Sequence, residues 1–380
     1  MKRILIVTER RADFSRFKPV IKLIKKEKKL DYQLLVTGLH LEKNYGLTIK
    51  EIYDENFKVY KKFKIFSKNY IKINDGAQMS EALGVAFIKI SRILRKSKPD
   101  LILSGFDIAA NFVVTVCGAH MNIPVAHIQG GEVSGTIDES LRHAMSKFSN
   151  IHFTANKETK GRLIKMGEEA KSIFIVGCPS IDALLAEKPK KKEEIYKNYK
   201  IDLNKITLLI IQHPVTSEIK EVENQMIKTL KAVKKSGLQH LIVFPNNDAG
   251  SNKILKIIKK SNLNFTQTLN LAEYKTILKS KTILIGNSSS GVHESATFKM
   301  PVINIGSRQD RRLKPKNVIN VKHNTDEILK AIKKVQSKQF FNMLKNLKNP
   351  YGDGTAAPKI IKIIKNLNLK NFKTQKKNTY

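Results

Sequence analysis

Several residue types that restrict function are scarce in this chain of 380 residues. It contains no tryptophan, only two cysteines (Cys117 and Cys178) and 7% aromatic residues. Two cysteines are too few for the disulfide framework of a secreted domain, so we expect reduced thiols and a cytoplasmic location. The interior must be aliphatic, because Ile, Leu and Val make up most of the apolar residues.

Long apolar runs and metal-binding patterns are also missing. The N-terminal run 4–7 is flanked by charged residues and is too short for a signal peptide or a membrane span. No other run reaches the roughly 18 apolar residues of a transmembrane helix. The sequence has no His-Glu-x-x-His pattern, no cysteine cluster and no Gly-x-Gly-x-x-Gly fingerprint after its first predicted strand. We therefore expect no metal and no cofactor.

Acidic residues are few relative to basic ones. The chain has 33 Asp and Glu against 70 Lys and Arg, which gives a formal net charge of +37. Such an excess raises the question of nucleic acid or an anionic membrane as a partner. However, the excess consists mainly of lysines along amphipathic helical patterns, as in 22–29 and 253–260, without an Arg-rich or aromatic-interleaved cluster. We expect no nucleic acid and no membrane partner, and a positive field that can steer a small anionic substrate.

Short β-branched segments alternate with helical patterns along the whole chain. The first series of predicted strands comprises 4–8, 32–37, 101–104, 125–128, 151–154 and 173–176. The second series comprises 207–211, 241–244, 282–285 and 302–305. Near-continuous apolar strands that are separated by helices indicate parallel sheets covered on both faces.

The length and a polar segment divide the chain. A length of 380 residues favours two domains of roughly 100–200 residues each. The charged, proline-containing segment 187–194 separates the two strand series. The predicted fold class is therefore α/β, with two Rossmann-like doubly wound domains at 1–190 and 191–368. A polar tail, 369–380, is expected to be frayed.

The strongest local motif follows the predicted strand 282–285, where residues 286–291 read GNSSSG and a helical pattern begins. One serine at such a turn is explained by helix capping, but three serines and two glycines are not. Small residues let a ligand approach the backbone, and a helix N-terminus suits a phosphate. We predict a phosphate site here. Glu294 either complements the helix dipole or accepts hydrogen bonds from ribose hydroxyls.

Polar residues also follow other predicted strands, whose carboxyl ends carry the ligand sites of doubly wound domains. Arg308 follows the strand 302–305 and can grip a diphosphate through two hydrogen bonds. His213 follows the strand 207–211 and can act as an acid or base, or donate to phosphate.

In the first half, an arginine within 10–11 can balance a phosphate, whereas Asp13 and Ser15 are each also explained as helix-capping residues. The long polar segment 127–143 brings carboxylates and histidines to one strand end, as acid–base catalysis requires.

Seven ordered motifs resemble the hydrolysing UDP-N-acetylglucosamine 2-epimerases of the sialic-acid pathway. They are RADFS at 11–15, GLHL at 38–41, GGEVSGTID at 130–138, QHPVT at 212–216, FPN at 244–246, GNSS at 286–289 and YGDG at 351–354. The resemblance spans residues 2–366. It implies a glycosyltransferase-B arrangement of the two domains, with the active site in the interdomain cleft. It also implies elimination of UDP to give 2-acetamidoglucal, followed by hydration to N-acetylmannosamine.

The resemblance implies the following site residues by position. The expected substrate ligands are Arg11, Ser15, His40, Gln129, Asn246, Ser288, Ser289, Gly291, Glu294 and Arg308. The expected catalytic acids and bases are Asp107, Asp138, His213 and Glu132. The expected partner is a small nucleotide sugar, and the expected assembly is a homo-oligomer, a dimer or tetramer.

Two positions depart from the family pattern. The usual Gly-Asp-Arg reads Phe106-Asp107-Ile108, and Gln129 stands where many members have glutamate. The absence of both the arginine and the glutamate is consistent with the loss of one ion pair, and equally with a loss of activity. Because glutamine cannot act as a base, that role has moved to Asp107, Glu132 or Asp138, or the substrate differs.

Three alternatives therefore stay open. A 2,4-diacetamido-2,4,6-trideoxy sugar nucleotide of a legionaminic-type pathway is one, because Phe106 and Ile108 suit a less polar sugar. The others are a glycosyltransferase of the same fold and a catalytically inactive nucleotide-sugar binder.

Overall fold

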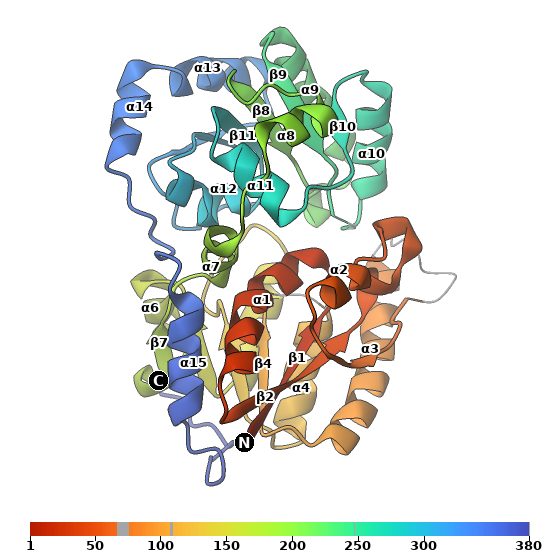
Figure 1. Ribbon diagram of the computed structural model, residues 1–380, viewed down its shortest axis with the longest axis vertical. Helices are drawn as coiled ribbons and strands as arrows, with labels where there is room; N and C mark the ends of the chain where they lie inside the picture. The colour runs from red at the N-terminus through yellow and green to blue at the C-terminus, as the bar shows by residue number, and fades with distance from the viewer. Residues whose placement is uncertain (67–75, 107–108, 247, 380) are drawn as a thin grey trace. The chain divides into compact units, whose positions relative to one another are not determined.

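The computed structural model describes residues 1–66, 76–106, 109–246 and 248–379 (Figure 1). The chain forms two compact units. Unit 1 comprises Met1–Glu132, Ile137–Ala183 and Gly352–Tyr380, and unit 2 comprises Val133–Thr136 and Leu184–Tyr351. In the described parts of the chain, each unit contains one parallel sheet, of seven strands in unit 1 and six in unit 2. The predicted α/β class is therefore confirmed.

The sheet of unit 1 has the order β3-β2-β1-β4-β5-β6-β7. Its strands are β1 (Lys2–Thr8), β2 (Leu30–Val36), β3 (Val59–Lys62), β4 (Leu101–Gly105), β5 (Val125–Ile128), β6 (Ile151–Thr154) and β7 (Ile173–Ile175). Its helices are α1 (Arg11–Lys26), α2 (Ile49–Asp54), α3 (Gly76–Ser97), α4 (Ala109–His120), α5 (Asp138–Phe148), α6 (Lys157–Lys165) and α15 (Ala356–Asn366), while α7 (Pro179–Ala186) contains the division between the units.

Both faces of this sheet are buried. Ile4 and Ile6 of β1 pack on one face with Phe17 of α1, and Leu5 and Val7 pack on the other face with α3 and α4. Successive residues of a strand point to opposite faces, which explains why β1 reads as an unbroken apolar run. The strand order reverses between β1 and β4, so the carboxyl ends of these two strands border the crevice where doubly wound sheets bind ligands.

The sheet of unit 2 has the order β10-β9-β8-β11-β12-β13. Its strands are β8 (Thr207–Ile211), β9 (Gln239–Val243), β10 (Phe265–Thr266), β11 (Thr282–Gly286), β12 (Val302–Ile305) and β13 (Val318–Val321). Its helices are α8 (Lys192–Tyr199), α9 (Val222–Lys235), α10 (Ser251–Lys260), α11 (Leu271–Leu278), α12 (Ser290–His293), α13 (Thr325–Val335) and α14 (Lys338–Lys345). The equivalent reversal lies between β8 and β11.

The edge strands β3, β10 and β13 are not among the strands predicted from the sequence. β3 is largely exposed, β10 spans only two residues, and β13 has no fully buried residue. Edge strands of this kind lack the continuous apolar run that identified the central strands. Among the helices that the structure describes, none combines the length and apolarity needed to cross a membrane.

The C-terminal helix α15 packs in unit 1, although its position in the sequence suggested the second domain. The sequence grouped residues 191–368 into one domain, whereas the structure places Gly352–Tyr380 in unit 1. There α15 packs along α1 (Figure 1). Its residues Ala357, Ile360 and Ile364 are buried in the same core as Phe17. Helical periodicity identifies an apolar stripe but not the surface that the stripe will cover.

The C-terminal tail, expected to be frayed, is hydrogen-bonded to unit 1 instead. The Lys376 ammonium lies 2.5 Å from Glu168 Oε2 and also donates to the carbonyl of Ser146. Asn150 Nδ2 donates to the Thr374 carbonyl at 2.8 Å. The Glu168 side chain is 1% exposed and also contacts His152 at 3.0 Å. Because a buried carboxylate requires partners, it draws the polar tail onto the surface.

We expect Lys376→Met to lower the free energy of unfolding by about 1.5–3 kcal/mol at pH 7, the usual contribution of a hydrogen bond to a charged group. Burial opposes ionisation of Glu168, but hydrogen bonds from His152 and Lys376 bring its pKa down to about 2. Because the pKa of Glu168 is lower in the folded state, its ionised form stabilises the protein at pH values above the ordinary pKa of 4.5. This stabilisation is lost as the pH falls toward 2.

The measurement is urea unfolding of wild type and variant between pH 7 and pH 3, where the difference between them should shrink. Lys377→Met is the matched control, since Lys377 is exposed on the same tail. An equal loss of stability in both variants would contradict the role given to Lys376.

Candidate functional site

In unit 2, β8 and β11 meet at the predicted phosphate loop. Gly286 ends β11 with φ of 127°, and a Cβ atom there would clash with the Ile211 carbonyl oxygen of β8. Only glycine allows this close approach without strain. The helix predicted to follow the loop begins at Ser290 but is short, because α12 ends at His293 and a 3₁₀ turn, Ser295–Phe298, follows.

Asn287 connects the ends of β8 and β11. Its side chain is buried, accepts the backbone N–H of His213 at 2.7 Å and donates to the carbonyl of the same residue at 2.9 Å. His213 Nδ1 accepts the backbone N–H of Asn246 at 3.2 Å, so the proton of the neutral ring lies on Nε2. The structure thus brings three predicted elements together at one sheet edge: the loop, His213 and Asn246.

Arg308 follows β12 and points at this loop. Its NH1 group donates to the Asn287 carbonyl at 3.2 Å, and Gln309 donates to the same oxygen at 2.8 Å. The guanidinium lies 4.0 Å from the Asp248 carboxylate. Arg308 Nε is buried and makes no hydrogen bond to any described residue. A guanidinium with an unused buried N–H beside a serine-rich loop suits an anionic oxygen.

Glu294 lies just beyond α12, with one carboxylate oxygen unused. The residue is 5% exposed, and its Oε2 atom has no hydrogen-bond partner among the described residues. Tyr274 of α11 hydrogen-bonds to Ser290, and burial together with the charge of Glu294 raises the tyrosine pKa. Buried polar atoms are normally paired, so an unused carboxylate oxygen indicates a missing donor such as a ligand hydroxyl. The sequence offered no signal for Tyr274, which lies in an ordinary helical pattern.

The remaining loop residues have different environments. Ser288 and Ser289 are partly exposed, and Ser288 Oγ accepts the backbone N–H of Ser290 at 3.3 Å. Gly291, predicted to contact substrate, is buried, and a Cβ atom there would lie 2.9 Å from Val302. Glycine at 291 therefore lets the short helix pack closely on β12.

In unit 1, polar residues follow β1, but several of them bond within the fold. Asp13 accepts the N–H groups of Glu9 and Arg10 at 2.9 and 2.8 Å, so it caps α1. The Ser15 hydroxyl donates to the Ala12 carbonyl at 2.9 Å. Arg11 pairs with Glu51 of α2, with Nε 2.9 Å from Oε2. Each of these side chains has a partner in the fold itself.

His40 connects the end of β1 to the residue that precedes α2 in the same unit. Its Nε2 atom lies 3.0 Å from the Thr8 hydroxyl, and its Nδ1 atom lies 2.7 Å from the Thr48 hydroxyl. Burial, and secondarily the charge of Arg11, lowers the pKa of His40 to about 3. The ring is therefore neutral at physiological pH, and both of its nitrogens already have a hydroxyl partner.

The loop after β5 carries Gln129 and Glu132, both buried. Gln129 has φ of 63° and donates through Nε2 to Glu132 Oε1 at 3.2 Å and to Cys178 Sγ at 3.1 Å. The buried Arg142 donates to the Glu132 carbonyl at 2.8 Å. Asp138 lies partly exposed in the first turn of α5. Asp107 and Ile108 lie outside the described residues.

Comparison with known proteins identifies the family. A model of the family UDP-N-acetylglucosamine 2-epimerase matches residues 22–365. The chain belongs to this family. A Legionella pneumophila protein named UDP-N,N'-diacetylbacillosamine 2-epimerase (hydrolyzing) is 32% identical over 384 residues, covering 100% of both chains. A UDP-N-acetylglucosamine 2-epimerase of Neisseria meningitidis serogroup B is 34% identical over 340 residues, covering 89% of this chain and 88% of its own.

A solved structure supports the fold of this family member. UDP-GlcNAc 2-epimerase from Neisseria meningitidis, crystallised with UDP-GlcNAc, matches with a TM-score of 0.81 at 19% identity, covering 96% of this chain and 100% of its own. The predicted fold class and family resemblance are both confirmed. The protein is by family a nucleotide-sugar 2-epimerase.

Glu9 is an acidic residue of this epimerase that the sequence analysis did not select. It follows β1, is 5% exposed, and its Oε2 atom accepts the Ala110 N–H at the start of α4 at 3.0 Å. Burial raises the pKa of Glu9 to about 7. The only sequence signal was its place directly after a buried strand.

We expect Glu9→Gln to raise the free energy of unfolding at pH 8 by about 3 kcal/mol, the equivalent of the pKa difference. Folded Glu9 holds its proton up to about pH 7, whereas the unfolded chain releases it near 4.5. Wild-type stability from this group is therefore present below pH 4.5 and is lost as the pH rises through 7. Glutamine keeps an acceptor for Ala110 without the ionisation.

Urea unfolding at pH 5 and pH 8 tests this expectation, since the gain should appear mainly at pH 8. Glu81→Gln on the exposed surface of α3 is the control and should show no such pH-dependent gain. A Glu9→Gln variant no more stable than wild type at pH 8 would contradict the raised pKa.

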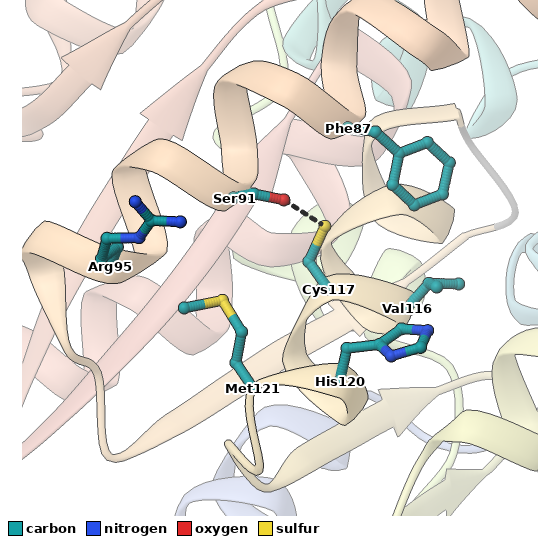
Figure 2. Close-up of a pocket in the computed structure, with 7 residues that line it drawn as sticks. All are labelled: Phe87, Ser91, Arg95, Val116, Cys117, His120 and Met121. Atoms are coloured by element: carbon teal, nitrogen blue, oxygen red, sulfur yellow. Dashed lines mark hydrogen bonds between the residues drawn. The ribbon is translucent and has the colours of Figure 1, made fainter.

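A separate cavity of about 340 Å³ lies between α3 and α4 of the epimerase (Figure 2). It is lined mainly by apolar atoms, with Arg95 and His120 at its edge. The Ser91 hydroxyl lies 3.3 Å from Cys117 Sγ, and burial raises the pKa of that thiol. None of the candidate-site residues described above lines this cavity. It is therefore separate from the candidate site.

Proposed function

We propose that the protein is a hydrolysing 2-epimerase that converts UDP-N-acetylglucosamine to N-acetylmannosamine and UDP. The reaction proceeds by elimination to 2-acetamidoglucal and then by hydration. The observation that carries the proposal is the site at the end of β11, where a serine-rich loop, Arg308 and His213 converge. Positive groups there stabilise the diphosphate as its bond to the sugar breaks.

The two units supply different chemical groups for this reaction. Unit 2 provides N–H donors for a diphosphate, and the buried Glu294 provides an acceptor for a ribose hydroxyl. Unit 1 provides the carboxylates of Glu132 and Asp138 for proton transfer at C2. We therefore assign nucleotide binding to unit 2 and sugar binding to unit 1.

A second substrate is a UDP-2,4-diacetamido-2,4,6-trideoxy sugar. It is favoured by Gln129 and by the similarity to the Legionella pneumophila relative along both whole chains. Phe106 was expected to contact the less polar sugar, but the residue is only 5% exposed. Its ring packs against Phe17, with the two ring centres 4.7 Å apart. Its ring therefore belongs to the core.

The test is to incubate purified protein with each UDP-sugar in D₂O, measure UDP release and identify the sugar by NMR. We expect free 2-epimerised sugar with deuterium at C2 and UDP in equal amounts. Release of UDP only in the presence of an acceptor would indicate a glycosyltransferase. Absence of UDP release with any 2-acetamido sugar nucleotide would refute the proposal.

A further inference from the structure

Arg16 connects the two positions at which this chain departs from its family. It lies on α1, and its guanidinium carbon is 5.2 Å from the centre of the Phe106 ring. Its NH1 group donates to Gln129 Oε1 at 3.4 Å. Phe106 directly follows β4 and Gln129 directly follows β5, so Arg16 reaches both at the carboxyl edge of the sheet. Its stacking on an aromatic face and its long hydrogen bond orient the guanidinium.

Gln129 also hydrogen-bonds to Glu132. Its Oε1 atom faces a donor, and its Nε2 atom faces the acceptor Glu132 Oε1 at 3.2 Å. This orientation of the amide is the one that satisfies both neighbours. Gln129 and Glu132 are 4% and 3% exposed, so water screens the contact little. The Arg16 guanidinium, the Gln129 amide and the Glu132 carboxylate therefore form a chain of two hydrogen bonds.

Glutamine at 129 places a neutral amide, not a second carboxylate, beside Glu132. The arginine expected at 108 and the glutamate expected at 129 are both absent from the sequence. Arg16 of α1 places a positive charge on one side of the Gln129 amide, and Glu132 places a negative charge on the other. A glutamate at 129 would place a second carboxylate beside Glu132, and two such groups cannot both ionise easily.

Two arginines donate to backbone carbonyls of the loop that carries Glu132. Arg142 of α5 donates to the Glu132 carbonyl, and Arg162 of α6 donates to the Gly131 carbonyl at 2.5 Å. The Gln129 amide also donates to Cys178 Sγ. Gln129 is therefore the position where one substitution would add a negative charge next to Glu132.

We propose that Arg16 and Gln129 are positioning residues for Glu132, and that Glu132 is the carboxylate that removes the C2 proton, an inference that rests on the proposed function. Glu132 takes the proton, the C2–H electron pair forms the C1–C2 double bond, and the C1–O bond breaks with departure of UDP. Glu132 then loses its proton to solvent. Hydration adds hydroxide to C1 and a proton to the opposite face of C2.

The test compares four variants with wild type: Glu132→Gln, Gln129→Glu, Arg16→Met and Arg16→Lys. UDP release and deuterium incorporation at C2 are measured from pH 6 to pH 9. We expect Glu132→Gln to lose at least about 100-fold in kcat, within the range of general acid–base catalysis. Gln129→Glu should lose about tenfold in kcat with little change in KM, and should shift the acidic limb of the profile upward by roughly one pH unit.

Arg16→Met should lower kcat about tenfold, and Arg16→Lys should restore part of the loss because it retains the charge. Arg92→Met is the matched control, an exposed arginine of α3 that should retain wild-type kcat. Thermal unfolding of each variant separates a folding defect from a positioning effect. If Arg16→Met does not fold, the isosteric Gln129→Glu variant decides the question.

The possible failures are distinguishable. Active wild type together with a Glu132→Gln variant of full activity would overturn the inference alone. Gln129→Glu with an unchanged kcat and pH profile would do the same. Wild type that releases no UDP from any 2-acetamido sugar nucleotide would refute the proposed function, and this inference with it.

Discussion

Replacing Arg308 with alanine is expected to lower kcat/KM for UDP release by about 100- to 1000-fold, the usual cost of removing one donor to a developing negative charge. The diphosphate gains charge as the bond to the sugar breaks, so a guanidinium matters more in the transition state than in the substrate complex. Arg308 is held in place by the Asn287 carbonyl and faces Asp248, while its Nε–H has no partner among the described residues. Steady-state UDP release at several substrate concentrations is the measurement.

The matched control is Arg311→Ala. Arg311 lies three positions further along the same segment and is exposed, so its loss should leave kcat/KM within about twofold of wild type. Arg308→Lys should be intermediate, because lysine keeps the charge but not the planar pair of donors. Equal losses in the Arg308 and Arg311 variants would indicate a general electrostatic effect and would contradict a specific site at Arg308.

Gly286→Ala is expected to lower the free energy of unfolding by about 3 kcal/mol or more, since it combines backbone strain with overpacking. The φ angle of 127° is one that alanine rarely adopts, and the added Cβ would clash with the Ile211 carbonyl. β11 would have to move away from β8, which would also break the two hydrogen bonds between Asn287 and His213. Activity should therefore fall together with stability.

Chemical denaturation with linear extrapolation measures this effect. Gly84→Ala is the matched control, because Gly84 lies inside α3 with no atom within 4 Å of its added Cβ. In a helix this change should stabilise by up to about 1 kcal/mol. A Gly286→Ala variant that is as stable as wild type would show that β11 and β8 can separate without cost.

Much of the phosphate site could be predicted from the sequence because its signals are local. A buried strand, a run of serines between glycines and a helical start lie within ten residues of one another, and all three are found at 282–293. His213 was predicted from its place after a strand, and Asn246 from the family resemblance. Parallel strands present their carboxyl ends at one edge, so these side chains converge once the strand order is known.

The candidate residues of unit 1 were less predictable. Arg11, Ser15 and His40 have the polar character expected of ligands, but each has a partner within the fold. Whether a polar side chain serves a ligand or the fold depends on its neighbours in space, which spacing along the chain does not reveal. Glu9 was overlooked for the same reason, because only its burial distinguishes it from other acidic residues.

The sequence by itself determined the α/β class, the central strands, the strand–loop–helix element at 282–293 and the family, because all of these follow from short-range periodicity and from ordered motifs. The tertiary structure decided which surface α15 covers, where Lys376 binds, and how Arg16 reaches Gln129 across 113 positions of sequence. These contacts are made by residues far apart in the chain, and each is selected by shape and by the need to pair buried charge. The phosphate loop is thus largely a local property, whereas the environment of Glu132 is a property of the folded unit.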